Sequence, residues 1–121
     1  MFKLSDREWA VLNVLWERQG AELGELVEAL RPATGWSRNT VFTYLTRMEA
    51  KGLVTIDKSG YPSVYRPALD RAQCQAMERR DFLNRVYGGA AGELVASFLR
   101  EEPISPDEVA QLRKLLDEME V

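Results

Sequence analysis

The chain has 121 residues, no histidine and one cysteine, and its net charge at pH 7 is −3. A chain of this length forms one domain, or one small domain with an appendage. The absence of histidine excludes Ser-His-Asp and Cys-His nucleophile pairs and His-ligated zinc, and a single cysteine excludes an internal disulfide. No glycine-rich phosphate loop or other catalytic motif is present, so we expect neither an enzyme nor a bound cofactor or metal.

The hydropathy of the chain favours a cytoplasmic protein. No apolar run approaches the roughly 18 residues that a spanning helix needs, and the first residues, MFKLSDREW, contain no apolar core of a secretory signal. We therefore expect no direct insertion into a membrane.

Two helices are predicted at the start of the chain. The segment Ser5–Glu8 has the pattern of a capping box, and the helix that follows runs to Gln19, where Gly20 ends it. A second helix covers about Leu23–Leu30, and Pro32 is expected to stop it. Apolar residues recur at helical spacing in both and form the expected core: Trp9, Leu12, Leu15, Trp16, Leu23, Leu26, Val27 and Leu30.

The third predicted helix has two different faces. Ser37 is its expected N-cap, and Gly52 ends it. One face carries core residues, namely Val41, Leu45 and Met48. The opposite face carries Asn39, Phe42, Thr43 and Thr46. A helix that only had to stay soluble would place Glu and Lys on that face, so its short polar side chains call for another explanation.

A short hairpin follows the third helix. Residues Leu53–Asp57 alternate and are rich in β-branched side chains, Lys58–Gly60 form a turn, and Val64–Arg66 form the returning strand. The order helix–helix–helix–strand–strand is that of a winged helix, in which the second motif helix enters the DNA major groove. Short polar side chains allow such a helix to approach base edges closely.

The charge distribution fits a polyanionic partner. Between Arg31 and Arg66 there are six basic and two acidic residues, a net charge of +4 in an acidic chain. We expect Arg38, Lys58 and Arg66 to contact phosphates. We expect Phe42 to contact a thymine methyl group. The predicted DNA-binding residues are Arg38, Asn39, Thr40, Phe42, Thr43, Thr46, Arg47, Lys58 and Arg66.

The rest of the chain is predicted to be helical. One helix begins after Asp70, another covers Gly92–Arg100, and Ser105–Glu108 form a second capping box before the last helix. The apolar faces of these helices need a partner, and a second copy of the chain would cover them. The predicted dimerisation residues are Phe82, Val86, Leu94, Phe98, Val109, Leu112, Leu116 and Met119.

The predicted fold is therefore mainly α with a small β-hairpin. Residues 1–69 form an N-terminal winged helix-turn-helix domain that binds DNA, and residues 70–121 form a C-terminal helical dimerisation domain. The alternative is a winged-helix module that binds another protein through Phe42, without sequence-specific DNA binding. A third reading, a regulator that binds a small ligand between the helices of a dimer, has no set of buried polar residues to support it.

Three segments resemble the penicillinase-repressor family, which includes methicillin-resistance repressors and copper-responsive relatives: LSDREWAVLNVLW, WSRNTVFTYLTRMEAKGLV and FLNRVYGGAAGELVASFL. The resemblance runs from about Leu4 to Leu116. It implies a homodimeric winged-helix repressor that binds a palindromic operator with TACA and TGTA half-sites. An inducing signal releases such repressors from DNA.

The resemblance also implies a route of induction. In the β-lactam-responsive branch a membrane sensor-protease signals, and the repressor is cut just before a Phe, which here corresponds to the bond between Ser97 and Phe98. The best-known members have Asn before that bond, and often carry basic residues where Asn39 and Phe42 stand here. The Cys-rich end of the copper branch has no counterpart in the final residues DEMEV.

Overall fold

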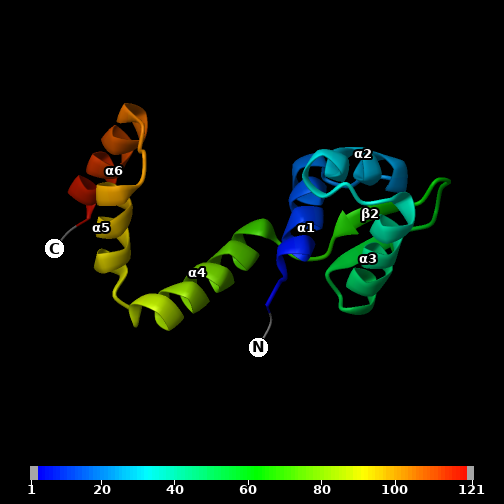
Figure 1. Ribbon diagram of the computed structural model, residues 1–121, viewed down its shortest axis with the longest axis horizontal. Helices are drawn as coiled ribbons and strands as arrows, with labels where there is room; N and C mark the ends of the chain where they lie inside the picture. The colour runs from blue at the N-terminus through cyan, green and yellow to red at the C-terminus, as the bar shows by residue number, and fades with distance from the viewer. Residues whose placement is uncertain (1–2, 120–121) are drawn as a thin grey trace. The chain divides into compact units, whose positions relative to one another are not determined.

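The computed structural model describes residues 3–119. These residues form two compact units, and the boundary between the units along the chain lies between Glu78 and Arg79. The elements, labelled in Figure 1, are α1 (Asp6–Arg18), α2 (Leu23–Thr34), α3 (Arg38–Ala50), β1 (Val54–Asp57), β2 (Val64–Pro67), α4 (Arg71–Tyr87), α5 (Ala91–Glu101) and α6 (Pro106–Glu118). A mainly helical fold with one small hairpin was predicted, and this is confirmed. The expected division of the chain after residue 69 stays a prediction.

Helix α1 begins at the predicted capping box. The Ser5 hydroxyl accepts a hydrogen bond from the Glu8 N–H at 3.2 Å, and the Glu8 carboxylate accepts one from the Ser5 N–H at 2.9 Å. The helix ends one residue earlier than predicted, at Arg18, and Gln19 after it has the left-handed conformation, with φ of 58°. Gly20 also has a positive φ, of 129°, and a Cβ at this position would lie 3.2 Å from the Arg66 side chain, so glycine lets the chain turn and pass β2 closely.

Helix α2 is longer than predicted. The expectation that Pro32 stops it was wrong, because the helix continues through Pro32 to Thr34. Proline removes only one hydrogen bond, to the carbonyl of Glu28, and both residues are exposed, so water can satisfy that carbonyl. Gly35, with φ of 66°, ends the helix instead and donates its N–H to the Arg31 carbonyl at 2.8 Å.

Helix α3 begins and ends as the sequence predicted. The Ser37 hydroxyl accepts the Thr40 N–H at 3.2 Å, which confirms the N-cap. Gly52, with φ of 80°, turns the chain out of the helix, and the Leu53 N–H donates to the Met48 carbonyl at 2.9 Å. This turn leads directly into β1, so the end of α3 and the start of the hairpin are fixed together.

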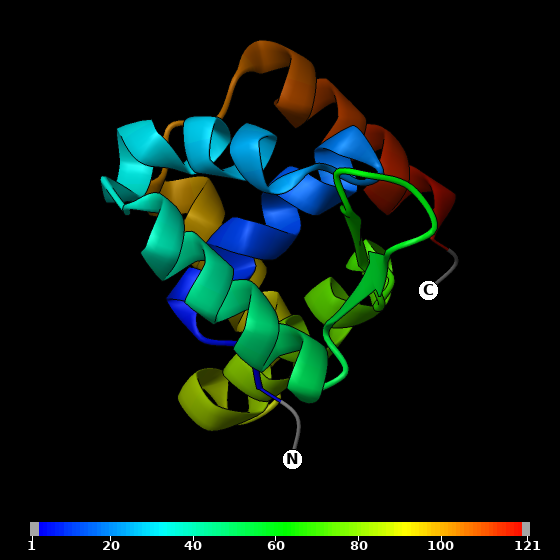
Figure 2. The ribbon, with the colours of Figure 1, turned by 90° about the vertical axis from the view of Figure 1, so that its right-hand side faces the viewer.

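The hairpin of β1 and β2, here called the wing, completes the core of the first unit. β1 and β2 are antiparallel, with Thr55 opposite Arg66 and Ile56 opposite Tyr65. β1 contacts α3 and β2 contacts α1, and Figure 2 shows the hairpin beside these helices. Tyr65 also exchanges two backbone hydrogen bonds with Ala21, at 2.8 and 2.9 Å. The core residues with no more than 2% exposure include Val11, Leu12, Leu15, Leu26, Val41, Leu45, Met48 and Val54.

The second unit consists of the last part of α4 with α5 and α6. α6 starts at the predicted capping box of Ser105 and Glu108, with Pro106 in its first turn. Neither α5 nor α6 has a buried residue. The large apolar side chain of Met119, directly after α6, is about half exposed, and so are those of Val95, Phe98, Leu99, Leu115 and Leu116 on the two helices. Within residues 3–119, no helix is both long and apolar enough to cross a membrane.

Candidate nucleic-acid interface

The outer face of α3 is the surface singled out from the sequence. Its inner face, formed by Val41, Leu45 and Met48, is buried against the core and fixes which side chains point outward. The exposed side chains are Arg38, Asn39, Phe42, Thr43, Thr46 and Arg47. Thr40 is only half-buried, and its hydroxyl lies 3.1 Å from that of the N-cap residue Ser37. Most predicted contacts therefore lie on one exposed helix.

The hydroxyl hydrogens of the two threonines on this face already form hydrogen bonds within the helix. Thr43 Oγ1 donates to the Asn39 carbonyl at 2.9 Å, and Thr46 Oγ1 donates to the Phe42 carbonyl at 3.0 Å. What remains for a partner is an oxygen that accepts hydrogen bonds and a methyl group. In the major groove, these fit the amino groups of adenine or cytosine and the methyl group of thymine.

Phe42 lies between these polar side chains and is 48% exposed. The alternative for this ring is packing on the wing or on a neighbouring helix. With about half of its surface open, the ring is free to press on an apolar group of a ligand. A thymine methyl group is the apolar feature that DNA presents in the major groove.

Contacts that no local sequence pattern predicts join helix α1 to α3. Arg7 donates a hydrogen bond to the Tyr44 hydroxyl at 2.7 Å. The Tyr44 ring stacks on Trp36, with centroids 4.8 Å apart and 10° between planes. Trp36 directly precedes the Ser37 cap, so the stack fixes the start of α3. Arg7 and Tyr44 are 37 positions apart, and no local pattern links them.

A buried carboxylate fixes the other end of α3. Glu8 is 5% exposed and accepts a hydrogen bond from Lys51 Nζ at 2.9 Å. Burial by itself raises the pKa of Glu8, but the hydrogen bonds from Ser5 and Lys51 outweigh this effect and leave the pKa below its usual range. Lys51 is therefore occupied with a structural contact.

The wing presents less positive charge than the sequence suggested. Arg66 pairs with Asp57 at 3.0 Å. Hydrogen bonds from the Ser59 side chain and backbone, and then from Arg66, hold the pKa of Asp57 at about 2, so it is ionised at neutral pH. The charge of Arg66 is thus compensated within the hairpin. Lys58 is exposed and forms no ion pair with a described residue.

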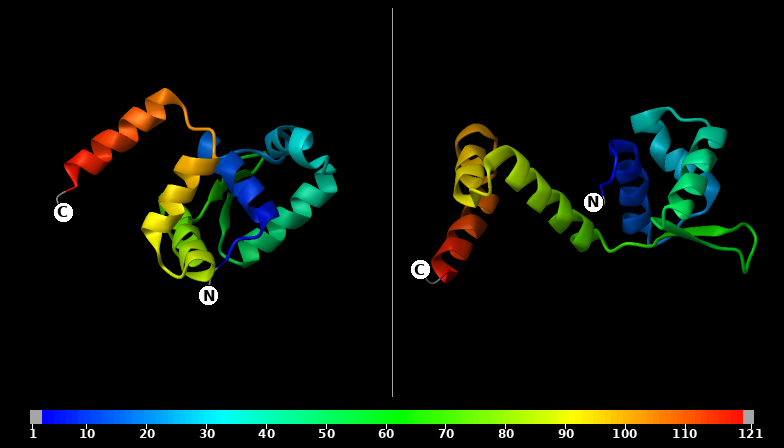
Figure 3. Two further views of the ribbon diagram at one scale, coloured as in Figure 1. Left: turned by 60° about the vertical axis from the view of Figure 1, so that its left-hand side comes forward. Right: turned by 90° about the horizontal axis from the view of Figure 1, so that it is seen from below.

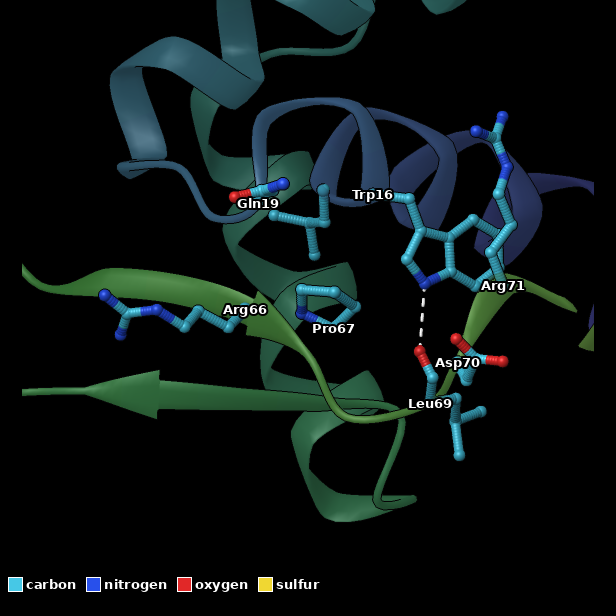
Figure 4. A pocket seen from close by; sticks show the side chains of 8 residues that line it. Trp16, Gln19, Arg66, Pro67, Leu69, Asp70 and Arg71 are labelled. Atoms are coloured by element: carbon cyan, nitrogen blue, oxygen red, sulfur yellow. Dashed lines mark hydrogen bonds between the residues drawn. The ribbon is translucent and has the colours of Figure 1, made fainter. Parts of the chain in front are cut away.

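A shallow groove of about 450 Å³ lies beside the wing, between the end of α1, β2 and the start of α4 (Figure 4). The Trp16 indole forms one wall and donates its N–H to the Leu69 carbonyl at 2.9 Å. The Arg71 guanidinium lies over the same ring, 5.8 Å from its centroid. These contacts fasten the chain after the wing to α1, and no local sequence pattern indicates them.

Cys74 is buried at the start of α4. Burial, and secondarily the Asp70 charge, raise the pKa of its thiol. A buried, protonated thiol is unreactive, so Cys74 contributes to packing.

The predicted dimerisation residues lie on the second unit. Val86, Phe98, Leu116 and Met119 are exposed, whereas Phe82, Leu94, Val109 and Leu112 are partly buried. The predicted cleavage site, Ser97–Phe98, lies in the middle of α5, and the Ser97 hydroxyl donates to the Glu93 carbonyl at 3.0 Å. That peptide bond is therefore part of a regular helix.

Three helices, a capped second motif helix and a hairpin define a winged helix-turn-helix protein of the DNA-binding class. The profile of the penicillinase repressor family matches residues 4–118. The chain is 31% identical over 116 residues to the penicillinase repressor of Bacillus licheniformis, covering 96% of this chain and 91% of that protein. It is 28% identical over 116 residues to the methicillin resistance regulatory protein MecI of Staphylococcus aureus (strain N315), covering 96% and 94%.

A solved structure agrees with these sequence relationships. The Bacillus licheniformis BlaI monomeric form in complex with the blaP half-operator matches with a TM-score of 0.53 and 31% identity, covering 59% of this chain and 87% of that one. The chain belongs to the penicillinase repressor family. The resemblance expected from the sequence is thereby confirmed.

Proposed function

We propose that this chain is a homodimeric transcriptional repressor that binds a palindromic operator and acts in the cytoplasm without catalysis of its own. The observation that carries the proposal is the outer face of α3, which is exposed, lacks acidic side chains between Arg38 and Arg47, and belongs to a member of a repressor family. A related repressor has been solved in complex with a half-operator. In this chain, α3 would enter the major groove.

The side chains on and around α3 divide into two roles. Asn39, Phe42, Thr43 and Thr46 contact base edges and select the sequence, because they are short or apolar and carry no charge. Phosphate contacts come from Arg38, Thr40, Arg47, Lys58 and Arg66, and they set affinity on any sequence. Lys58 is the stronger phosphate contact of the wing, since Asp57 compensates the charge of Arg66.

The second unit supports association of two copies. Five large apolar side chains of α5 and α6 are about half exposed, and helices of 11 and 13 residues are marginal without a partner. A two-fold dimer would place two α3 helices about one turn of DNA apart, matching a palindrome. The bound dimer then represses by occluding the promoter.

Induction follows from loss of the dimer, because one half-site provides only half of the contacts. A membrane sensor-protease or its pathway could deliver the signal by cleavage between Ser97 and Phe98. Since this bond lies inside α5, a protease can reach it only after the helix unwinds locally. Cleavage there would separate α6 from the rest of the chain.

The test is a selection from random duplex DNA with the purified protein at two salt concentrations. We expect a palindrome, with TACA-like arms if Asn39 and Phe42 leave the family preference unchanged, and binding that weakens steeply as salt rises. No enrichment even at low salt would overturn the proposal. In that case, binding to another protein with an affinity that does not change with salt would favour the alternative, a protein-interaction module with Phe42 as its anchor.

A further inference from the structure

Tyr61 is the most exposed large apolar residue among those described. The residue is 99% exposed, whereas no other large apolar residue among those described exceeds 59%. It belongs to the loop of residues 58–63, which joins β1 to β2 and extends beyond the three helices of its unit (right panel of Figure 3). The core of the winged helix makes no use of this ring, so its position calls for a partner outside the unit.

The loop that carries Tyr61 has a fixed base. Asp57 accepts hydrogen bonds from the Ser59 N–H at 2.9 Å and from the Ser59 hydroxyl at 2.6 Å, and Arg66 holds its other oxygen. These bonds tie the first residues of the loop to both strands. The fixed residue Ser59 lies two positions before Tyr61, so the backbone that leads to the ring is anchored.

The charges around Tyr61 suit a polyanion. Asp57 is the only acidic residue between 57 and 66, and Arg66 compensates it. Lys58 remains as an exposed cation on the loop. The tip of the wing therefore presents one positive charge, one aromatic ring and one phenol hydroxyl, and residues 57–66 hold no uncompensated carboxylate.

We propose that Tyr61 enters the minor groove beside each half-site and selects A·T over G·C pairs there. The proposal rests on the function proposed above, which places α3 in the adjacent major groove. The ring packs on deoxyribose and the phenol hydroxyl donates to adenine N3 or thymine O2, the acceptors of that groove. In a G·C pair the N2 amino group of guanine lies in the minor groove at this place, and because it is itself a donor it disfavours the approach of the phenol O–H. Lys58 contacts the neighbouring phosphate.

Base analogues separate minor-groove from major-groove reading. The operator obtained by selection is prepared with four different pairs at the position under the wing: A·T, G·C, inosine·C and diaminopurine·T. Inosine·C lacks the minor-groove amino group but keeps the major-groove pattern of G·C, and diaminopurine·T has the reverse combination. Dissociation constants are measured by fluorescence anisotropy for the wild type, Tyr61→Phe, Tyr61→Ala and the control Lys58→Ala.

We expect the wild type to bind the A·T and inosine·C operators about fivefold more tightly than the other two, as the loss of one hydrogen bond implies. Tyr61→Phe should remove this difference while retaining the ring contact, and Tyr61→Ala should also weaken binding to all four. Lys58→Ala should weaken binding to all four equally and keep the preference. Because Tyr61 is fully exposed, its variants should have the same circular dichroism and melting temperature as the wild type.

Each other outcome overturns a specific statement. If G·C and inosine·C bind alike, the wing does not read the minor groove. If Tyr61→Phe keeps the wild-type preference, the phenol hydroxyl does not distinguish the base pairs. If Tyr61→Ala binds all four duplexes as tightly as the wild type, the ring does not contact DNA and serves another partner, such as a protein. If the wild type binds none of the duplexes, the proposed function fails as well. Failure of the Tyr61 proposal alone would instead leave wild-type binding to the operator intact.

Discussion

Lys51, just past the last residue of α3, donates a hydrogen bond at 2.9 Å to the buried carboxylate of Glu8 in the first turn of α1. The same carboxylate accepts the Ser5 N–H in the capping box of α1. One side chain thus caps one helix and holds the end of another. The orientation of the proposed recognition helix therefore depends on a residue that lies outside the outer face of α3.

Removing this charge should reveal the coupling between the two helices. Glu8→Gln retains the size of the side chain and a capping-box acceptor, but loses the ion pair, and we expect the free energy of unfolding to fall by about 1 kcal/mol. Lys51→Ala should cost a similar amount in the wild type and almost nothing in the Glu8→Gln background. Urea unfolding of the four proteins measures this, and additive losses would show that the two side chains do not interact.

The pH dependence of stability should follow the lowered pKa of Glu8. A carboxyl whose folded pKa lies below its unfolded value stabilises the fold above the unfolded value, near 4.5, and this contribution is lost as the pH falls through the folded value. Between pH 6 and pH 3.5, the wild type should therefore lose more stability than Glu8→Gln. Equal losses in urea unfolding at the two pH values would contradict the assignment.

The ion pair on the wing leads to a gain-of-binding prediction. Asp57→Asn retains an acceptor for Ser59 but releases Arg66, so affinity for any duplex should rise at low salt. The slope of log K against log salt should become steeper by about one unit, as for one more phosphate contact. Glu17→Gln, which removes an equal charge from the exposed side of α1, is the control and should change the slope less. An unchanged slope for Asp57→Asn would mean that Arg66 does not meet a phosphate.

The exposed ring of Phe42 can be tested with modified DNA. If it presses on a thymine methyl group, replacing the contacted thymine by uracil should weaken wild-type binding by about 0.8 kcal/mol, the value of one buried methylene-sized group. Phe42→Ala should bind the thymine and uracil operators equally. Its melting temperature should stay near that of the wild type, since the ring is half exposed. A uracil effect that persists in Phe42→Ala would rule out this contact.

The proposed dimer depends on the exposed face of α6. Leu116→Glu places a charge on that face and should convert the protein to a monomer in sedimentation equilibrium, with a large loss of affinity for the full palindrome. Gln111→Glu adds the same charge to the same helix at an exposed polar position and should leave the dimer intact. A Leu116→Glu protein that remained dimeric would place the interface elsewhere.

Local sequence signals predicted the helix starts well. Ser5, Ser37 and Ser105 cap helices as expected, because a cap needs only a hydroxyl and an N–H three residues later. The signals for helix ends were weaker. Whether Pro32 ends α2 depends on whether water reaches one carbonyl, and that depends on the tertiary structure.

The electrostatic state of the predicted site was less accessible to sequence reasoning. Arg66 was counted as a free cation, but strand register brings it to Asp57, nine residues away. The contact between Arg7 and Tyr44 joins residues that only the packing of α1 on α3 brings together. Sequence periodicity defines which face is exposed, whereas partners across elements follow from the fold.

The internal hydrogen bonds of Thr43 and Thr46 have an entropic consequence for recognition. Each hydroxyl is already held by a carbonyl of its own helix, so these side chains are ordered before any ligand arrives. Immobilising a flexible side chain on binding costs roughly 0.5–1.5 kcal/mol, and long lysines or arginines on this face would incur that cost. A surface that is rigid before binding adapts poorly to a mismatched DNA sequence, so it distinguishes its operator from other sequences more strongly than a flexible surface would.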